Sequence, residues 1–142
     1  MKTRFLPFCL VALLAGCATP PGTHTVQAVR TYEKPYDQVW EDVVEFLASN
    51  NIQIKNIAKD SGVIYAERMS FKNDIADCGQ PGLFQIVGRT GGFNIFVRRT
   101  KDKAQVSINT TFKETRQFQS TVMSVDCTST GVLENQILAA IK

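Results

Sequence analysis

Apolar residues recur at helical spacing in two stretches of the chain. In the first, Pro35 opens an apolar stripe whose opposite face is acidic or polar, and this pattern predicts an amphipathic helix ending at Asn50 and Asn51. The second stretch predicts a final helix capped by Ser129 or Thr130. The residues expected to be buried are Tyr36, Val39, Trp40, Val43 and Leu47 in the first helix, and Leu133, Ile137 and Ile141 in the second.

Between these helices, alternating apolar and polar residues predict strands, most clearly at residues 106–112. Turn residues at 60–62 and at 101–102 are expected to close hairpins. Other strands are expected at residues 26–32, 52–55, 63–69 and 93–99. The order strand, helix, antiparallel strands, helix predicts a two-layer α+β domain, in which both helices pack on one face of an antiparallel sheet.

Part of this pattern resembles BamC-type lipoproteins. The segments Tyr32-Glu-Lys-Pro-Tyr-Asp-Gln-Val-Trp40, Asn51-Ile-Gln-Ile54 and Asp60-Ser-Gly-Val-Ile-Tyr65 are similar to the Tyr-Asp-x-Val-Trp helix, the x-Ile-x-Ile strand and the Ser-Gly-x-Ile/Tyr hairpin of their helix-grip domains. The resemblance covers residues 26–69 and implies a helix-grip-like fold. It concerns fold more than function, because it consists mainly of core and turn positions.

The N-terminus has the pattern of a secretory signal. Lys2 and Arg4 precede an apolar run at residues 5–15, which is shorter than the roughly 20 residues that cross a bilayer and lacks the polar positions of a core helix. The run Leu14-Ala15-Gly16-Cys17 resembles the lipobox of bacterial lipoproteins. The resemblance implies cleavage before Cys17 and lipid on its sulfur and new amino group, which would anchor the protein stably to a membrane.

The lipobox divides the chain into a signal peptide at 1–16, a lipidated tether at 17–25 and a single α+β domain at 26–142. In lipoproteins of this kind the residue after the cysteine biases sorting, and Ala18, in place of aspartate, favours the periplasmic face of the outer membrane. Without the signal, 14 basic residues face 13 acidic ones. This near-neutral balance gives no electrostatic argument for nucleic acid as a partner.

Two cysteines remain after Cys9 leaves with the signal and Cys17 carries lipid. Cys78 and Cys127 would then lie in an oxidising compartment, where we expect them to form a disulfide. The alternatives are a catalytic thiol and a metal site, although a metal needs more ligands than these two. A disulfide here closes a loop of about 50 residues, worth about 4 kcal/mol in the chain-entropy model.

Residues with potential chemistry form no complete set. The one histidine, His24, lies in the tether, which argues against Ser-His-Asp catalysis. The glycine-rich residues 88–92 lead into a strand, whereas a phosphate loop leads into a helix. Asp74 and Asp77 are suited either to acid–base chemistry or to an Asx turn in a solvated loop. We therefore predict no enzymatic activity, no cofactor and no metal.

Residues 70–91 are the least regular part of the domain, and irregular segments of this length are uncommon unless functional or disordered. A partner is expected to dock here and near Ser129, with the disulfide at the base of the loop; alternatively, residues 83–87 are one more strand. The expected docking residues are Phe71, Leu83, Phe84, Ile86 and Arg89.

These features predict a non-enzymatic interaction or accessory module of the cell envelope, with the membrane and another envelope protein as partners. The alternative is a domain that binds a small hydrophobic ligand between helix and sheet. The aromatic side chains expected in the core would leave no cavity for such a ligand. A basic cluster at residues 98–103 either contacts anionic headgroups or is a solvated hairpin end. The aromatics expected in the core are Trp40, Phe93, Phe96 and Phe112.

Overall fold

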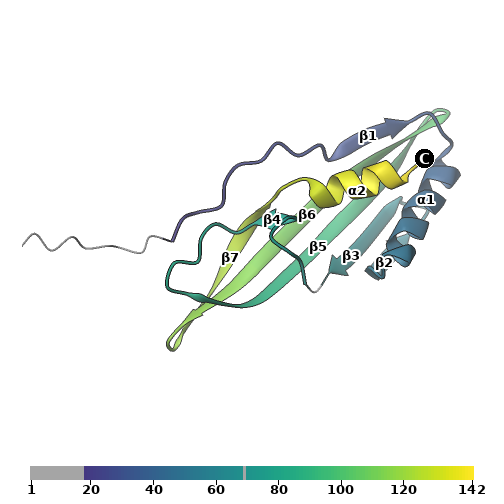
Figure 1. Ribbon diagram of the computed structural model, residues 1–142. Coiled ribbons are helices and arrows are strands. Elements are labelled where there is room, and N and C mark those ends of the chain that lie inside the picture. The colour runs from purple at the N-terminus through teal and green to yellow at the C-terminus, as the bar shows by residue number, and fades with distance from the viewer. Residues whose placement is uncertain (1–17, 69) are drawn as a thin grey trace, which may run out of the picture.

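The computed structural model describes residues 18–68 and 70–142. These residues form a seven-stranded antiparallel sheet with two helices on one face (Figure 1), so the expected α+β class is confirmed. The strands are β1 (Val29–Tyr32), β2 (Gln53–Ala58), β3 (Val63–Arg68), β4 (Ala76–Asp77), β5 (Gln85–Thr100), β6 (Lys103–Phe118) and β7 (Thr121–Ser129), and the helices are α1 (Tyr36–Ser49) and α2 (Val132–Ala140).

One long hairpin forms the centre of the sheet. β5 and β6 each have 16 residues and pair along their length, and the expected turn at residues 101–102 connects them. β3 and then β2 extend the sheet beyond β5. β1 pairs with the first part of β6 and β7 with its last part, so that two shorter strands share one edge of β6.

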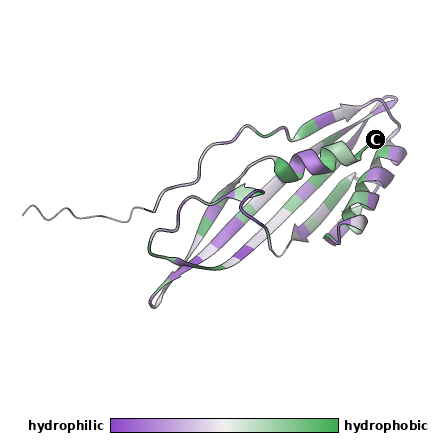
Figure 2. Ribbon diagram, viewed as in Figure 1, coloured by the Kyte–Doolittle hydropathy of each residue, from purple (hydrophilic) through white to green (hydrophobic). Residues whose placement is uncertain are grey.

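The core lies between the helices and the inner face of the sheet. The apolar stripe predicted for α1 is buried, and hydropathy alternates along the long strands, as Figure 2 shows. Trp40, Phe93 and Phe112 lie in this core as expected. Phe96 does not, because its register with Val63 places it on the opposite, outer face of the sheet, where it is half-buried.

The strands extend further than the sequence predicted. β5 begins at Gln85 rather than at residue 93, β6 continues to Phe118, and β7 was not expected at all. Residues 85–87 therefore belong to a strand, while Leu83 and Phe84 precede it. The expected cap of α2 at Ser129 or Thr130 was also wrong, because the residue before the helix is Gly131, with a φ of 86°. The hydroxyl of Ser129 accepts a hydrogen bond from the N–H of Gly131.

The predicted signal peptide and the lipobox cysteine, Cys17, lie outside the described residues. Within residues 18–68 and 70–142, no helix is both long enough and apolar enough to cross a bilayer.

Candidate functional site

The long strands continue past the helices as a three-stranded arm, formed by residues 85–90 of β5, 113–118 of β6 and 121–126 of β7 (Figure 1). Residues 70–84, which we call the strap, cross the inner face of this arm. The strap contains β4, which pairs with the end of β7. Thr130, just after β7, donates hydrogen bonds from its backbone N–H and its hydroxyl to the carbonyl oxygen of Ile75.

A disulfide fixes the strap covalently to β7. The sulfur atoms of Cys78 and Cys127 are 2.02 Å apart, which confirms the predicted pair. Cys127 lies opposite Phe112 in the sheet, so its side chain is on the inner face beneath the strap. The disulfide therefore holds the strap at its middle, and not at its base as the sequence predicted.

Three charged side chains form a network between the strap and the sheet. Glu114 and Arg116 of β6 are only 1% and 4% exposed. One carboxylate oxygen of Glu114 accepts a hydrogen bond from Nε of Arg116 at 2.7 Å, and the other accepts from Nε of Arg89 at 2.8 Å. Charges buried to this degree are tolerated only when they are paired and hydrogen-bonded.

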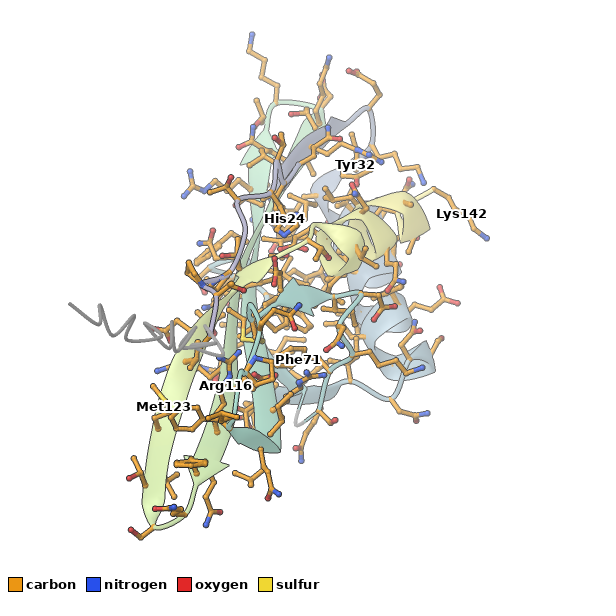
Figure 3. The ribbon with its side chains drawn as sticks, turned by 60° about the vertical axis from the view of Figure 1, so that its left-hand side comes forward. His24, Tyr32, Phe71, Arg116, Met123 and Lys142 are labelled. Atoms are coloured by element: carbon orange, nitrogen blue, oxygen red, sulfur yellow. A yellow bond between two sulfur atoms is a disulfide. The ribbon has the colours of Figure 1, made fainter. Side chains whose placement is uncertain are left out.

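Arg116 also binds the strap directly. Its guanidinium donates to the carbonyl oxygens of three consecutive strap residues: Cys78, Gly79 and, at 3.2 Å, Gln80. Figure 3 shows Arg116 beside the strap, and Met123 lies opposite Arg116 on the neighbouring strand β7. Because Glu114 holds the guanidinium from one side, the strap backbone is fixed to the sheet by charge-assisted hydrogen bonds.

Two of the expected docking residues are engaged inside the domain. Phe71 is 5% exposed and packs against Phe112 with 5.0 Å between ring centroids, so it belongs to the core and not to a docking surface. Arg89 is paired with Glu114, and its guanidinium carbon lies 5.7 Å from the centre of the Phe71 ring. These two residues hold the strap in place.

The other expected docking residues lie toward the end of the arm. Leu83 is 72% exposed and Ile86 is also exposed. Phe84 is half-buried, with its ring 5.8 Å from that of Phe118. The structure thus separates the predicted residues into a pair that makes contacts inside the domain and an apolar group at the far end of the arm.

The segment expected to be a spacer lies against the strap. The backbone N–H of Gln80 donates to the carbonyl oxygen of Thr19 at 3.1 Å, and the two residues form a β-bridge. Gly79 has a φ of 70°, and a Cβ there would lie 2.0 Å from the carbonyl oxygen of Thr19. Only glycine permits this close approach of the two backbones.

Asp77 joins the tether to the strap by hydrogen bonds. One carboxylate oxygen accepts from the N–H of Gly79 at 2.8 Å, the Asx turn considered above, and the other accepts from the N–H of Gly22 at 2.9 Å. Nε2 of His24 lies 3.2 Å from the second oxygen. Three hydrogen bonds lower the pKa of Asp77: the one from the N–H of Gly79 has the largest effect, followed by those from the N–H of Gly22 and from His24. We call this set of contacts the clasp.

A groove of about 350 Å³ opens where the tether, the strap and β5 meet. Polar and apolar groups line it in similar proportion, and the polar ones include the side chains of the clasp. The polar lining residues are His24, Asn73, Asp77, Gln80, Arg89 and Thr130, and the apolar ones include Ala76, Cys78, Pro81 and Ile86.

A second buried acid, Glu134 of α2, lies at the neighbouring helix start and accepts hydrogen bonds from the hydroxyls of Thr110 at 2.7 Å and Ser129 at 2.9 Å. Sequence reasoning missed Glu114, Arg116 and Glu134. For the first two a signal existed: they continue the period of two that places Phe112 inward.

No protein-family model matches the chain, and no curated protein is significantly similar to it. Within the described residues, no three His, Cys, Asp or Glu side chains are grouped so that they could hold a metal ion.

Replacing Glu114 should destabilise the domain strongly. In Glu114→Gln, Arg116 and Arg89 lose their buried counter-charge, and breaking such a pair typically costs about 3–5 kcal/mol of unfolding free energy. Urea denaturation with the disulfide intact measures the loss. Asp126→Asn is the matched control, because its pair with Lys113 is exposed and 3.6 Å long, and it should change the stability little. Equal effects of the two substitutions would contradict the role given to Glu114.

Removing the charge of Asp77 should loosen the tether. Asp77→Asn places a weaker acceptor, or an opposing NH₂ group, against Gly22, so amide hydrogen exchange at Gly22 should become faster. Because the pKa of Asp77 is lowered in the folded protein, the clasp is complete at neutral pH and should weaken in the wild type as the pH falls through that lowered pKa. Asp74→Asn, whose side chain is exposed, should leave the exchange at Gly22 unchanged.

Proposed function

We propose that the protein is a lipid-anchored, non-enzymatic interaction module at the periplasmic face of the outer membrane. Its anchor is the lipid on Cys17, and its domain is of the helix-grip type found in BamC-type lipoproteins. The lipobox residues support the anchor. The packing of the α1 stripe on the sheet supports the helix-grip likeness.

The observation that carries the interaction role is the preformed groove between the strap and the tether. Its walls are fixed by the disulfide, the Glu114 network and the clasp, so little ordering entropy is lost when a partner enters. Asn73, Gln80 and Thr130 offer hydrogen-bonding groups at its rim. A polar rim of this kind suits a non-obligate protein partner, which we take to be an exposed segment of another envelope protein.

The alternative, a small hydrophobic ligand between helix and sheet, has weaker support. Trp40, Phe93 and Phe112 occupy the space that such a ligand would need, together with the buried stripe of α1. Pockets for small ligands are mostly apolar cavities, whereas polar side chains line about half of the groove described above.

Substitution of Cys17 tests the anchor. The full-length Cys17→Ser protein should no longer incorporate a radiolabelled fatty acid, because both attachment points depend on this residue. Cys9→Ser is the matched control and should keep the label, since Cys9 lies within the predicted signal. Label retained by Cys17→Ser would refute the lipoprotein proposal.

Photo-crosslinking in cells tests the groove. A photoreactive residue at Asn73 or at Gln80 should capture the same envelope protein, and the purified pair should re-form the complex. Gln38 and Glu41 are exposed on α1 and serve as control positions, where capture should be absent. Equal capture on α1 would contradict docking in the groove. A bound lipid in native mass spectrometry, without a crosslinked protein, would favour the ligand-binding alternative.

A further inference from the structure

Exposed apolar side chains gather at the end of the arm. We define the arm tip as residues 81–88 and 117–125. Six of the nine large hydrophobic residues that are exposed in the described part of the chain lie there, and a concentration of this kind marks an interaction site. They are Leu83, Ile86, Val87, Phe118, Val122 and Met123.

The arm tip also carries no charged side chain of its own, and the two charged residues of β6 that lie between its strands, Glu114 and Arg116, are buried and paired with each other. Residues 79–88 and 117–125 contain no Asp, Glu, Lys, Arg or His. The opposite end of the same two strands is the basic hairpin end at residues 98–103, where Arg99 stacks on Tyr36 and Lys103 pairs with Glu33. The 16 residues of β5 separate these ends by about 45–50 Å. One long hairpin thus has a charged end and an uncharged apolar end.

The apolar side chains of the tip lie on both faces of the arm. Ile86 and Met123 each pair with Arg116 in the sheet and therefore share its inner face. Val122 pairs with Gln117, the next residue along β6, and therefore lies on the outer face. A protein docked on a sheet face would contact one of these sets. Immersion of the tip in an apolar medium contacts both.

The predicted anchor begins beside the tip. Thr19 forms a β-bridge with Gln80, and the predicted anchor residue is two positions earlier in the sequence, a separation that a chain spans in at most about 7 Å. The carbonyl oxygen of Gln80 accepts a hydrogen bond from Arg116, which lies level with Ile86 and Met123. From Arg116, β6 continues about 10 Å to the turn that ends the tip. Figure 1 shows the start of the described chain at the same end of the molecule as this turn.

We propose that the arm tip inserts into the boundary between headgroups and acyl chains of the membrane that holds the lipid on Cys17; the choice of membrane rests on the proposed anchor. Peripheral apolar surfaces enter this boundary to about 5–10 Å, which matches the reach of the tip. Unpaired backbone at the strand edges limits this depth. In the described chain, no strand pairs with the outer edge of β5 before Gly91, and none pairs with the outer edge of β7 before Thr128. Such edges need water and cannot enter the hydrocarbon core.

Insertion sets the orientation of the whole domain. The basic hairpin end would point away from the bilayer by about the length of β5, which is several times the Debye length of about 8 Å at physiological salt. Contact of that cluster with anionic headgroups is then excluded, and the groove, which shares Gln80 with the tether bridge, lies near the membrane surface.

Tryptophan quenching tests the insertion. The full-length protein is reconstituted in vesicles of phosphatidylethanolamine and phosphatidylglycerol with brominated acyl chains. Leu83→Trp and Val122→Trp replace exposed residues, and each should lose roughly half of its added fluorescence, because bromine quenches on contact near the acyl boundary. The matched control Lys101→Trp, at the opposite end of the hairpin, should not be quenched. The native Trp40 is buried in the core and gives the background.

The same preparations distinguish this proposal from the anchor. Mass spectrometry reports whether Cys17 carries lipid. Lipidated protein with an unquenched tip would contradict insertion but support the anchor. Quenching of the tip in protein without lipid would support insertion but contradict the anchor. Quenching at the tip should also disappear in Val122→Glu combined with Leu83→Trp. If the tip is unquenched and sedimentation shows dimers that Leu83→Glu dissociates, the tip binds a second copy of the chain, and insertion is wrong.

Discussion

The carboxylate of Glu114 is the group on which the arm depends. The inner face of β6 continues past Phe112 with two charged positions that water scarcely reaches, and only Glu114 supplies the negative charge that Arg116 and Arg89 both require. All buried side-chain nitrogen and oxygen atoms of the described residues have a hydrogen-bond partner. The network is therefore complete, and the loss of Glu114 would leave Arg116 as an unpaired buried charge.

Net stability does not explain such a network. A buried ion pair is often no more stabilising than well-packed apolar residues of the same volume, because desolvation offsets the attraction. Apolar side chains could not, however, bind the three consecutive carbonyl groups of residues 78–80. Arg116 does so, and its planar guanidinium defines one position for the strap. We infer that the charges are kept because they fix where the strap lies.

The strap in turn fixes the tether, because the strap backbone forms hydrogen bonds to the sheet on one side and to the tether on the other. The carbonyl oxygens of residues 78–80 point to Arg116, while the N–H of Gln80 binds Thr19 and the carboxylate of Asp77 binds Gly22. The disulfide to Cys127 prevents the strap from lifting as a whole. Arg116 of β6 thus positions the strap, and the strap positions the tether where the chain leaves the domain toward Cys17.

The sequence predicted the parts of the fold that bury one face against the helices. The stripe of α1 and the alternation of Val106, Ile108 and Phe112 are periodic because they face a single core, and both were confirmed. Beyond Phe112 the inward positions are charged, which conceals the period, and β7 was missed because its side chains are exposed or only half-buried. The cysteine count indicated the disulfide. The contacts of the tether join residues more than fifty positions apart, and no local pattern encodes them.

An apolar strand end with unpaired edges is a hazard for a protein in water, since it offers both backbone and side chains to a second chain. Charged residues normally reduce this hazard, and the exposed charged pair of the arm, Lys113 and Asp126, lies at its base. The tip instead combines apolar side chains on both faces with glutamine, serine and threonine between them. At the boundary of a bilayer the apolar groups meet acyl chains, while headgroup water still reaches the backbone edges. That environment satisfies both sets of groups at once, and the strap, by fixing the tether beside the tip, brings the domain to it in a single orientation.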